Sequence, residues 1–460
     1  MCRCTPGFIH LSASHSIFTV LYTVIYQFAS CALALFVCVG LGVSILYALI
    51  LGFVLFCGYG VYRGHGLREM LSLALSGIRT VKGILLTFLL IGVITALWRR
   101  SGTIAFIICH ALDLCGERVM LPAAFLLCAL ISYLTGTAFG TAATMGVICA
   151  ALAAGMGIPT AYIGGAVLSG SYFGDRCSPM STSALLVSSL TGTDIYRNLG
   201  GMVKTSLVPF FASVALYALL GLGLHGSYDV SQMQALFSGA FKLTPPVLLP
   251  AAIIVLLSLF KVNVKAAMGV SIFCSAAICI FVQGAAPAEL ISDAVFGFRP
   301  GSQQLSALLG GGGILSMARV FFIVCISSCY PGMLGVTGLL DRVQDTLAAF
   351  GRRTTAFCCI LVCSIFTSII SCNQTLAVML THQLCLNVEP DRRRLALDLE
   401  NTVIVVAPLI PWSIAGAVPL AAIGAPEGSL LFSFYLYLIP LCCLAQSFFT
   451  RHMERRAASS

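Results

Sequence analysis

The chain has 460 residues, of which 59% are hydrophobic and only 9% are charged, whereas a soluble protein carries roughly 25% charged residues. Apolar runs of about 20 residues, long enough to cross a bilayer, recur between Ile17 and Phe449. They predict an integral membrane protein and leave no interval long enough for a soluble domain.

The formal charge of +9 is typical of basic cytoplasmic loops under the positive-inside rule. The basic residues are scattered and are not interleaved with aromatic ones, so we do not expect nucleic-acid binding. Two basic clusters flank predicted spans and are expected in the cytoplasm: Arg63, Arg68, Arg79 and Lys82, and Arg451, Arg455 and Arg456.

The 21 cysteines lie mostly in apolar segments and show no CxxC spacing, which favours buried free thiols over a disulfide framework. The N-terminus has one basic residue before a long apolar stretch and does not match a cleaved signal peptide.

In chain order, Ile17–Cys38 and Val43–Tyr62 are predicted as the first two spans. Gly66–Thr80 has apolar residues near helical spacing with charges between them, which predicts an amphipathic interfacial helix. Gly83–Trp98 is the third span. Ser101–Cys115 is apolar but short, contains His110 and Asp113, and is predicted to enter the membrane without crossing it.

The stretch from Tyr133 to Thr193 is apolar but rich in Gly, Ser, Thr and Pro, and it holds the pair Asp175–Arg176. Charged residues at membrane depth mark pathways or sites, and broken helices free backbone groups for binding. We therefore interpret this stretch as half of a transport site. Its two GxxxG patterns, Gly136–Gly140 and Gly170–Gly174, predict close helix approach.

Further segments follow Asp194. They are Lys204–Leu224, Val247–Phe260, Val264–Val282, a span after Gly310–Gly313 that carries Arg319, an interfacial Leu340–Phe350, Thr355–Ile370 and Ser429–Phe449. Together they give about 11–13 membrane segments, some of them re-entrant.

A second broken region, Ile370–Pro426, repeats the plan of the first. Each has a small polar loop, then a helix, then an acidic residue near a proline break. Paired interrupted segments indicate inverted repeats, here about 83–224 and 310–449 within a single domain, 1–460. The predicted fold is an all-α polytopic transmembrane helical bundle with broken helices.

A cation-coupled carrier needs oxygen ligands and a carboxylate that can hold an ion or a proton. Asp175 and Glu400 are the best-placed acids. Neutral oxygens are available from Thr135, Thr137, Thr141, Ser169, Ser171, Ser178, Ser181, Asn373, Thr375, Asn401 and Thr402.

Structural roles compete with these assignments. Asp175 could form a salt bridge with Arg176, and Glu400 could be a helix-end charge near Arg392–Arg394. Any single hydroxyl could simply bond a helix carbonyl. Arg319 is better explained by pairing or snorkelling than by solute binding.

Enzyme signatures do not support catalysis. No HExxH or GxSxG occurs, and the GxGxxG match at Gly221–Gly226 ends an apolar span instead of following a strand. We expect no catalytic residues and no enzyme activity.

Three segments, LTGTAFGTAATMGV, GIPTAYIGGAVLSGSYFGDRCSPMS and APLIPWSIAGA, resemble the NhaC-type Na⁺/H⁺ antiporter family, which includes malate/lactate-type exchangers. The resemblance runs from about Gly66 to Phe449. It implies a multi-pass antiporter of the bacterial plasma membrane, with the hairpins and inverted repeats of the ion-transporter superfamily and an elevator-like movement.

The chain departs from the family pattern at three acids. The family pattern S-P-L-S-D-T-T-N corresponds to Ser178–Leu185 in this chain, where Thr182 replaces the Asp. G-D-Q-Y becomes C-N-Q-T, with Asn373, and L-E-D-S becomes L-E-N-T, with Asn401. An amide or hydroxyl can bind Na⁺ but cannot exchange it for a proton near neutral pH.

The sequence therefore predicts Na⁺/H⁺ exchange, with Na⁺ ligands from Asp175, Asn373 and Glu400, and with Na⁺ and H⁺ as cargo and no cofactor. The alternative is exchange of a small organic anion or amino acid, coupled to Na⁺ or H⁺, with Arg176 or Arg319 facing its carboxylate. A non-transporting relative is a third reading. Expected partners are membrane lipid and an inorganic cation or small organic solute. The sequence leaves open whether the chain forms a homodimer.

Overall fold

The computed structural model describes residues 33–34, 37–38, 43–111, 116–224, 230–260, 262–330, 332–333, 354–371 and 373–459. Within these ranges the secondary structure is helical, apart from an isolated bridge between Phe298 and Gly311. The all-α prediction is therefore confirmed. Most of the first predicted span, Asp113 and the interfacial segment Leu340–Phe350 lie outside the described residues.

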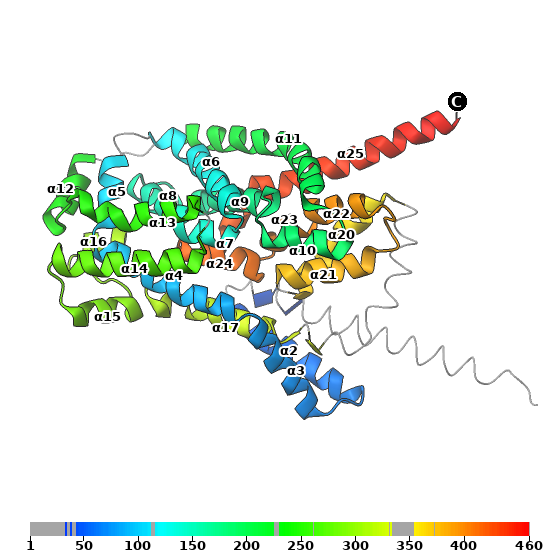
Figure 1. The fold of residues 1–460 in the computed structure, drawn as a ribbon, viewed down its shortest axis with the longest axis horizontal. Coiled ribbons are helices and arrows are strands. Elements are labelled where there is room, and N and C mark those ends of the chain that lie inside the picture. The colour runs from blue at the N-terminus through cyan, green and yellow to red at the C-terminus, as the bar shows by residue number, and fades with distance from the viewer. Residues whose placement is uncertain are drawn as a thin grey trace, which may run out of the picture.

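Many helices run along the long axis of the molecule (Figure 1). The first half contains α2 (Ile45–Tyr62), α3 (Leu67–Thr80), α4 (Lys82–Arg100), α5 (Thr103–Ala111), α6 (Glu117–Thr135), α7 (Ala138–Thr141), α8 (Val147–Gly155), α9 (Thr160–Cys177), α10 (Thr182–Thr191) and α11 (Ile195–Leu222). A π turn over Ala142–Gly146 joins α7 to α8.

The second half contains α12 (Val230–Ala240), α13 (Leu249–Leu259), α14 (Val264–Phe281), α15 (Pro287–Phe296), α16 (Gln303–Leu309), α17 (Ala318–Ser327), α20 (Ala356–Ser371), α21 (Gln374–Cys385), α22 (Arg392–Asn401), α23 (Val403–Val406), α24 (Ile414–Ala422) and α25 (Phe434–Ser459). Short 3₁₀ turns precede α13 and α17, follow α23 and precede α25.

Among the described residues, 4 helices are long and apolar enough to cross a membrane, or up to 7 if each of three bent pairs is one span. One pair is α4 and α5, which meet at 63°, where the sequence predicts a segment that does not cross. Another runs from Arg392 to Ala422 with a 57° bend. The polytopic helical bundle is thus confirmed, and the count of about 11–13 segments, like the repeat bounds, stays a prediction.

Some helix bounds differ from the hydropathy pattern because caps fix them. α11 begins at Ile195 and not at Lys204, because the Asp194 carboxylate accepts the Arg197 N–H at 2.9 Å and starts the helix nine residues before the apolar run. α15 begins at Pro287, a residue suited to a first helical turn, in a stretch that hydropathy leaves outside the spans.

Glycines bring α6 and α9 into backbone contact in the middle of the bundle. A Cβ at Gly170 would overlap the Phe125 carbonyl, and one at Gly174 would overlap the backbone of Ser132 and Tyr133. The predicted close approach at Gly170–Gly174 is confirmed. Gly136 acts differently, because it ends α6 in the left-handed conformation at φ 66°.

We expect Gly174→Ala to destabilise the protein by about 1–3 kcal/mol, the usual cost of forcing extra volume into a filled interior. The matched control is Gly200→Ala in α11, where a new Cβ meets nothing within 4 Å. Thermal unfolding midpoints of the detergent-purified proteins compare the two. Equal midpoints would contradict the close contact of α6 with α9.

Candidate functional site

Asp175 lies near the end of α9 and is 6% exposed. Its Oδ2 accepts the Ser183 hydroxyl at 2.7 Å and the Gln374 side-chain amide at 3.4 Å, while Oδ1 accepts the Ser181 hydroxyl at 3.4 Å. The carboxylate is thus surrounded by neutral donors, and the predicted salt-bridge alternative with Arg176 does not occur in the described structure.

Three helices begin beside this carboxylate. Thr137 caps α7, whose first amide, that of Ala138, faces Asp175. Ser181 caps α10, and Asn373 caps α21. A helix N-terminus carries partial positive charge, so the three together stabilise negative charge at one point.

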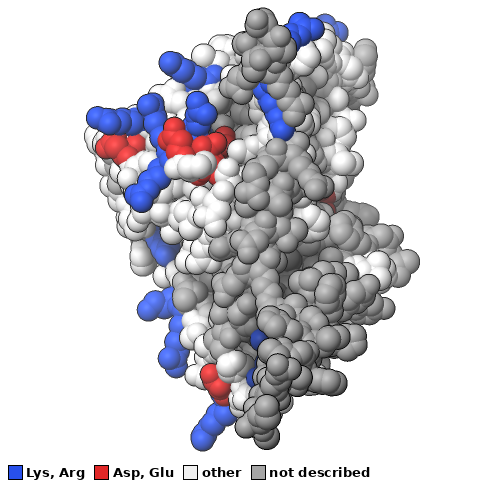
Figure 2. Space-filling model, turned by 90° about the vertical axis from the view of Figure 1, so that its right-hand side faces the viewer, with Lys and Arg blue, Asp and Glu red and all other residues white. Residues whose placement is uncertain are grey.

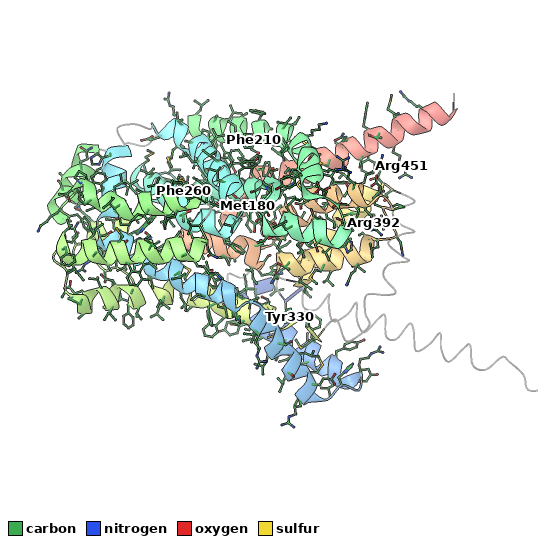
Figure 3. All side chains as sticks on the ribbon, viewed as in Figure 1. Met180, Phe210, Phe260, Tyr330, Arg392 and Arg451 are labelled. Carbon is green, nitrogen blue, oxygen red and sulfur yellow. The ribbon has the colours of Figure 1, made fainter. Side chains whose placement is uncertain are left out.

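The glycine at position 136 explains how the first of these helices reaches the site. A Cβ there would lie 2.5 Å from the carbonyl carbon of Met180, in the break between α9 and α10. The turn after α6 therefore packs directly on that break. Figure 3 shows Met180 in the middle of the molecule along its long axis.

Arg176 points away from Asp175, since adjacent helical side chains diverge by about 100°. Its buried guanidinium donates to the carbonyls of Glu400 at 3.1 Å and Met202 at 3.2 Å, and to Thr205 Oγ1 at 2.7 Å. Shorter bonds reach Ser206 Oγ and Asn401 Oδ1. Both ends of the guanidinium fork are engaged, so Arg176 joins α9 to α11 and α22.

Glu400 lies near the end of α22, is fully buried, and precedes the irregular Thr402 at φ −120° and ψ −85°. Neither of its carboxylate oxygens has a hydrogen-bond partner among the described residues. Asp175 and Arg176 lie within electrostatic reach of it. Burying an unpaired carboxylate is costly, and a bound proton or cation would remove that cost.

Some of the other predicted residues lie near this site, and others form hydrogen bonds within the surrounding helix packing. Ser169 accepts the Tyr217 hydroxyl at 2.8 Å, and Thr402 donates to the Asp398 carbonyl at 2.6 Å. Thr375 is exposed. Thr135 and Thr141 face each other at 3.4 Å, Ser178 accepts the Met180 amide at 3.2 Å, and the buried Ser171 Oγ has no partner among the described residues.

Two residues that contact Asp175 are absent from the predicted set, Ser183 and Gln374. A signal existed for each. Ser183 follows the α10 cap by two residues, and Gln374 stands inside the polar loop Ser371–Thr375. Two arginine assignments are also settled. Arg319 pairs with Glu427 at 3.3 Å on the surface, and Arg392–Arg394 lie at the opposite end of α22 from Glu400.

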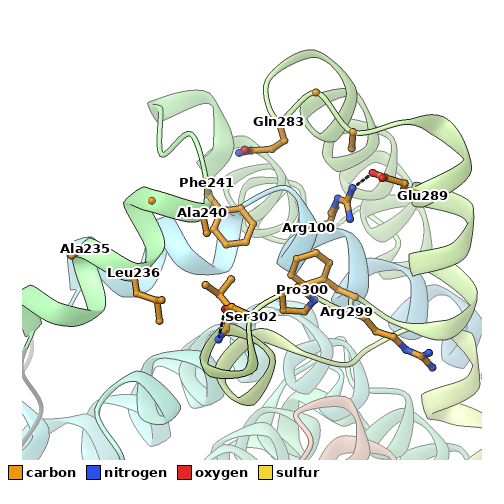
Figure 4. A pocket seen from close by; sticks show the side chains of 16 residues that line it. Arg100, Ala235, Leu236, Ala240, Phe241, Gln283, Glu289, Arg299, Pro300 and Ser302 are labelled. Carbon is orange, nitrogen blue, oxygen red and sulfur yellow. Dashed lines mark hydrogen bonds and ion pairs between the residues drawn. The ribbon is translucent and has the colours of Figure 1, made fainter.

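A pocket of about 630 Å³ lies away from these acids (Figure 4). Arg100, Phe241, Glu289 and Arg299 are among its lining residues, and Arg100 pairs with Glu289. It contains none of the predicted site residues. Among the described residues, no cluster of three or more His, Cys, Asp or Glu side chains can hold a metal ion.

The model of the Na⁺/H⁺ antiporter family matches residues 8–194 and 170–449. The chain belongs to this family. The Na⁺/H⁺ antiporter NhaC of Alkalihalophilus pseudofirmus is 25% identical over 83% of this chain and 85% of its own. The family resemblance predicted from the central motifs is therefore confirmed.

Relatives in the family differ in what their names say they carry. The malate-2H⁺/Na⁺-lactate antiporter of Bacillus subtilis is 26% identical over 87% of this chain and 88% of its own. The arginine/ornithine antiporter ArcD of Halobacterium salinarum is 28% identical over 80% and 78%. Family membership therefore indicates antiport but does not identify the transported ion or solute, which has to be inferred from the site.

Arg176→Gln is expected to lower the free energy of unfolding by about 2 kcal/mol or more, because it leaves several buried acceptors without donors. Arg176→Lys should recover part of this loss, since it keeps the charge but not the planar fork. The control, Arg319→Gln, removes an exposed pair worth at most about 1 kcal/mol. Thermal unfolding in detergent measures all three. If Arg176→Gln were as stable as Arg319→Gln, Arg176 would not be the structural joint described here.

Proposed function

We propose that the chain is a secondary active antiporter that exchanges Na⁺ for H⁺ across the bacterial plasma membrane and needs no resident cofactor. One observation carries the proposal. Two buried carboxylates lie at the helix breaks in opposite surroundings, Asp175 among donors and Glu400 without any among the described residues.

Asp175 is the proposed Na⁺ site. The hydroxyls of Ser181 and Ser183 donate to it now, but a hydroxyl also has acceptor lone pairs and can rotate to present them to a cation. The side chain of Gln374 carries a carbonyl oxygen beside its amide nitrogen. One carboxylate with three neutral oxygens around it suits a partly dehydrated hard cation.

Glu400 is the proposed proton site. A protonated carboxyl group is neutral, so it can stay buried without a partner at a far lower cost than an ionised one. Asp175 lies within electrostatic reach of Glu400, so Na⁺ at Asp175 cancels the negative charge that favours a proton on Glu400. Na⁺ and H⁺ therefore load in alternation, and the carrier is expected to move Na⁺ in one direction and H⁺ in the other.

The organic-solute alternative is weaker because it needs a free arginine for the solute's carboxylate. Arg176 donates to seven neighbouring groups, and Arg319 is paired with Glu427. Neither is available in this structure. For this reason we propose a cation as the cargo, although two relatives are named for organic solutes.

The orientation follows from charge. Figure 3 shows Arg392 and Arg451 at the same end of the molecule, and Figure 2, which faces that end, shows Lys and Arg around a smaller group of acids. Basic residues are retained on the cytoplasmic side. We place this end in the cytoplasm.

Everted membrane vesicles test the proposal. Adding Na⁺ to vesicles that hold a proton gradient should dissipate it, and Asp175→Asn should slow this by at least about 10-fold, since loss of one site interaction of 1.4 kcal/mol has that effect. The control is Asp194→Asn, an exposed cap at which Asn serves as well as Asp. No response of the wild type to Na⁺, Li⁺ or K⁺ would overturn cation exchange, and counterflow of malate, lactate or arginine would then support the alternative.

A second assay should distinguish the roles of the two acids. Proteoliposomes loaded with Na⁺ can exchange it for external ²²Na⁺ without any net proton movement. Glu400→Gln, which mimics a permanently protonated acid, should retain this Na⁺/Na⁺ exchange and lose Na⁺/H⁺ exchange. Asp175→Asn should lose both. Loss of Na⁺/Na⁺ exchange in a folded Glu400→Gln variant would contradict the assignment of the proton to Glu400.

A further inference from the structure

The helix α3, Leu67–Thr80, carries an exposed row of leucines that the transport site does not use. Leu67, Leu71 and Leu75, the leucine stripe, are spaced four residues apart and so share one face of the helix. Their side chains are 57%, 44% and 58% exposed. Figure 1 shows α3 at the lower edge of the bundle. The leucine stripe therefore faces outward from the protein.

A second side of α3 fixes the helix to the rest of the protein. Met70 and Ala74 are buried and belong to a core cluster that includes Ile323 of α17. At Gly77 an added Cβ would overlap the carbonyl of Ser328, just after α17. These contacts hold α3 in one orientation, so the outward direction of the leucine stripe is fixed as well.

The chain on either side of α3 places this helix at a membrane surface. α2 is long and apolar enough to cross a bilayer, and α4 begins the next candidate span, a bent pair with α5. One span ends where α3 begins and the next begins where α3 ends, so α3 connects two spans at the same surface. Four basic residues and one acid occupy the interval 63–82, which assigns this surface to the cytoplasm.

The charges of α3 are arranged around the leucine stripe. Counted around the helix axis, Arg68 lies about 20° from Leu75 and Arg79 about 40° from it. Both arginines are exposed, and neither has a hydrogen-bond or ion-pair partner among the described residues. The acid of the helix, Glu69, lies about 120° from Leu75, and its carboxylate is 3.4 Å from the His65 imidazole. The edge of the leucine stripe thus carries two positive charges, while the acid faces elsewhere.

We propose that α3 is a docking helix for the anionic phospholipids of the cytoplasmic leaflet. The leucine stripe enters the boundary between headgroups and acyl chains, and Arg68 and Arg79 reach the lipid phosphates from its edge. An anionic surface attracts such basic segments, and a guanidinium binds phosphate oxygens through paired N–H donors. A second copy of the chain fits less well, because a two-fold contact would bring the same arginines together.

Tryptophan fluorescence in nanodiscs of phosphatidylglycerol tests the docking without a transport measurement. Leu71→Trp places an indole in the leucine stripe, and Ser76→Trp, five residues later, places one on the polar side of α3. The native Trp98 and Trp412 are each 1% exposed, and the wild type supplies their signal for subtraction. Lipids brominated on the acyl chain should quench Leu71→Trp at least about 3-fold more strongly than Ser76→Trp, because only the stripe reaches the acyl chains.

The choice of headgroup is tested with Leu71→Trp as the reporter. Brominated phosphatidylglycerol should quench it more strongly than brominated phosphatidylcholine at equal mole fraction. Adding Arg68→Gln and Arg79→Gln should lower the relative affinity for the anionic lipid about 5-fold or more, since one basic residue near an anionic surface contributes roughly that factor. Adding Arg68→Lys and Arg79→Lys instead keeps both charges and should retain the preference. Thermal unfolding midpoints establish that each variant is folded.

Two results would overturn the proposal. Equal quenching of Leu71→Trp by the two brominated lipids would exclude recognition of anionic headgroups. Equal quenching of Leu71→Trp and Ser76→Trp would exclude docking of the leucine stripe, and native mass spectrometry would then show whether a second copy of the chain covers it. Either result would leave the Asp175-dependent exchange untouched, because no step of these assays depends on transport.

Discussion

The buried guanidinium of Arg176 is the interaction on which the centre of the molecule depends. It bonds α11 through Met202, Thr205 and Ser206, and α22 through Glu400 and Asn401. All of these partners are neutral groups. A full positive charge therefore stays inside the bundle without a contacting carboxylate, with the Glu400 carboxyl group within electrostatic reach.

That arrangement gives the two acids, one on α9 and one on α22, different surroundings. Asp175 is held by side chains from α10 and α21, and it lies where three helices begin. Glu400 shares the Arg176 neighbourhood but has no donor of its own among the described residues. The amide oxygen of Asn401 accepts from Arg176 and adds no negative charge beside the guanidinium.

Most of the helical fold and part of the candidate site could be predicted from the sequence. Proline and glycine breaks are local features, so the ends of α9 and α6 and the polar loop before α21 could be predicted from residues alone. The contacts of Ser183 and Gln374 with Asp175 could not, because Gln374 lies 199 positions from Asp175 and only tertiary packing brings it there. The start of α11 could not be predicted either, because its first turns are polar and only the Asp194 cap marks where the helix begins.

The direct backbone contact of α6 with α9 limits how this protein can move. At Gly170 and Gly174 the backbones of the two helices touch directly, with no side chains between them. The helices therefore cannot slide past one another without losing this close packing. The α7 turn follows α6 and sits on the break after α9. α6, α9 and the Asp175 carboxylate near the end of α9 therefore form one rigid piece, and any relative movement within the protein has to take place at its edges.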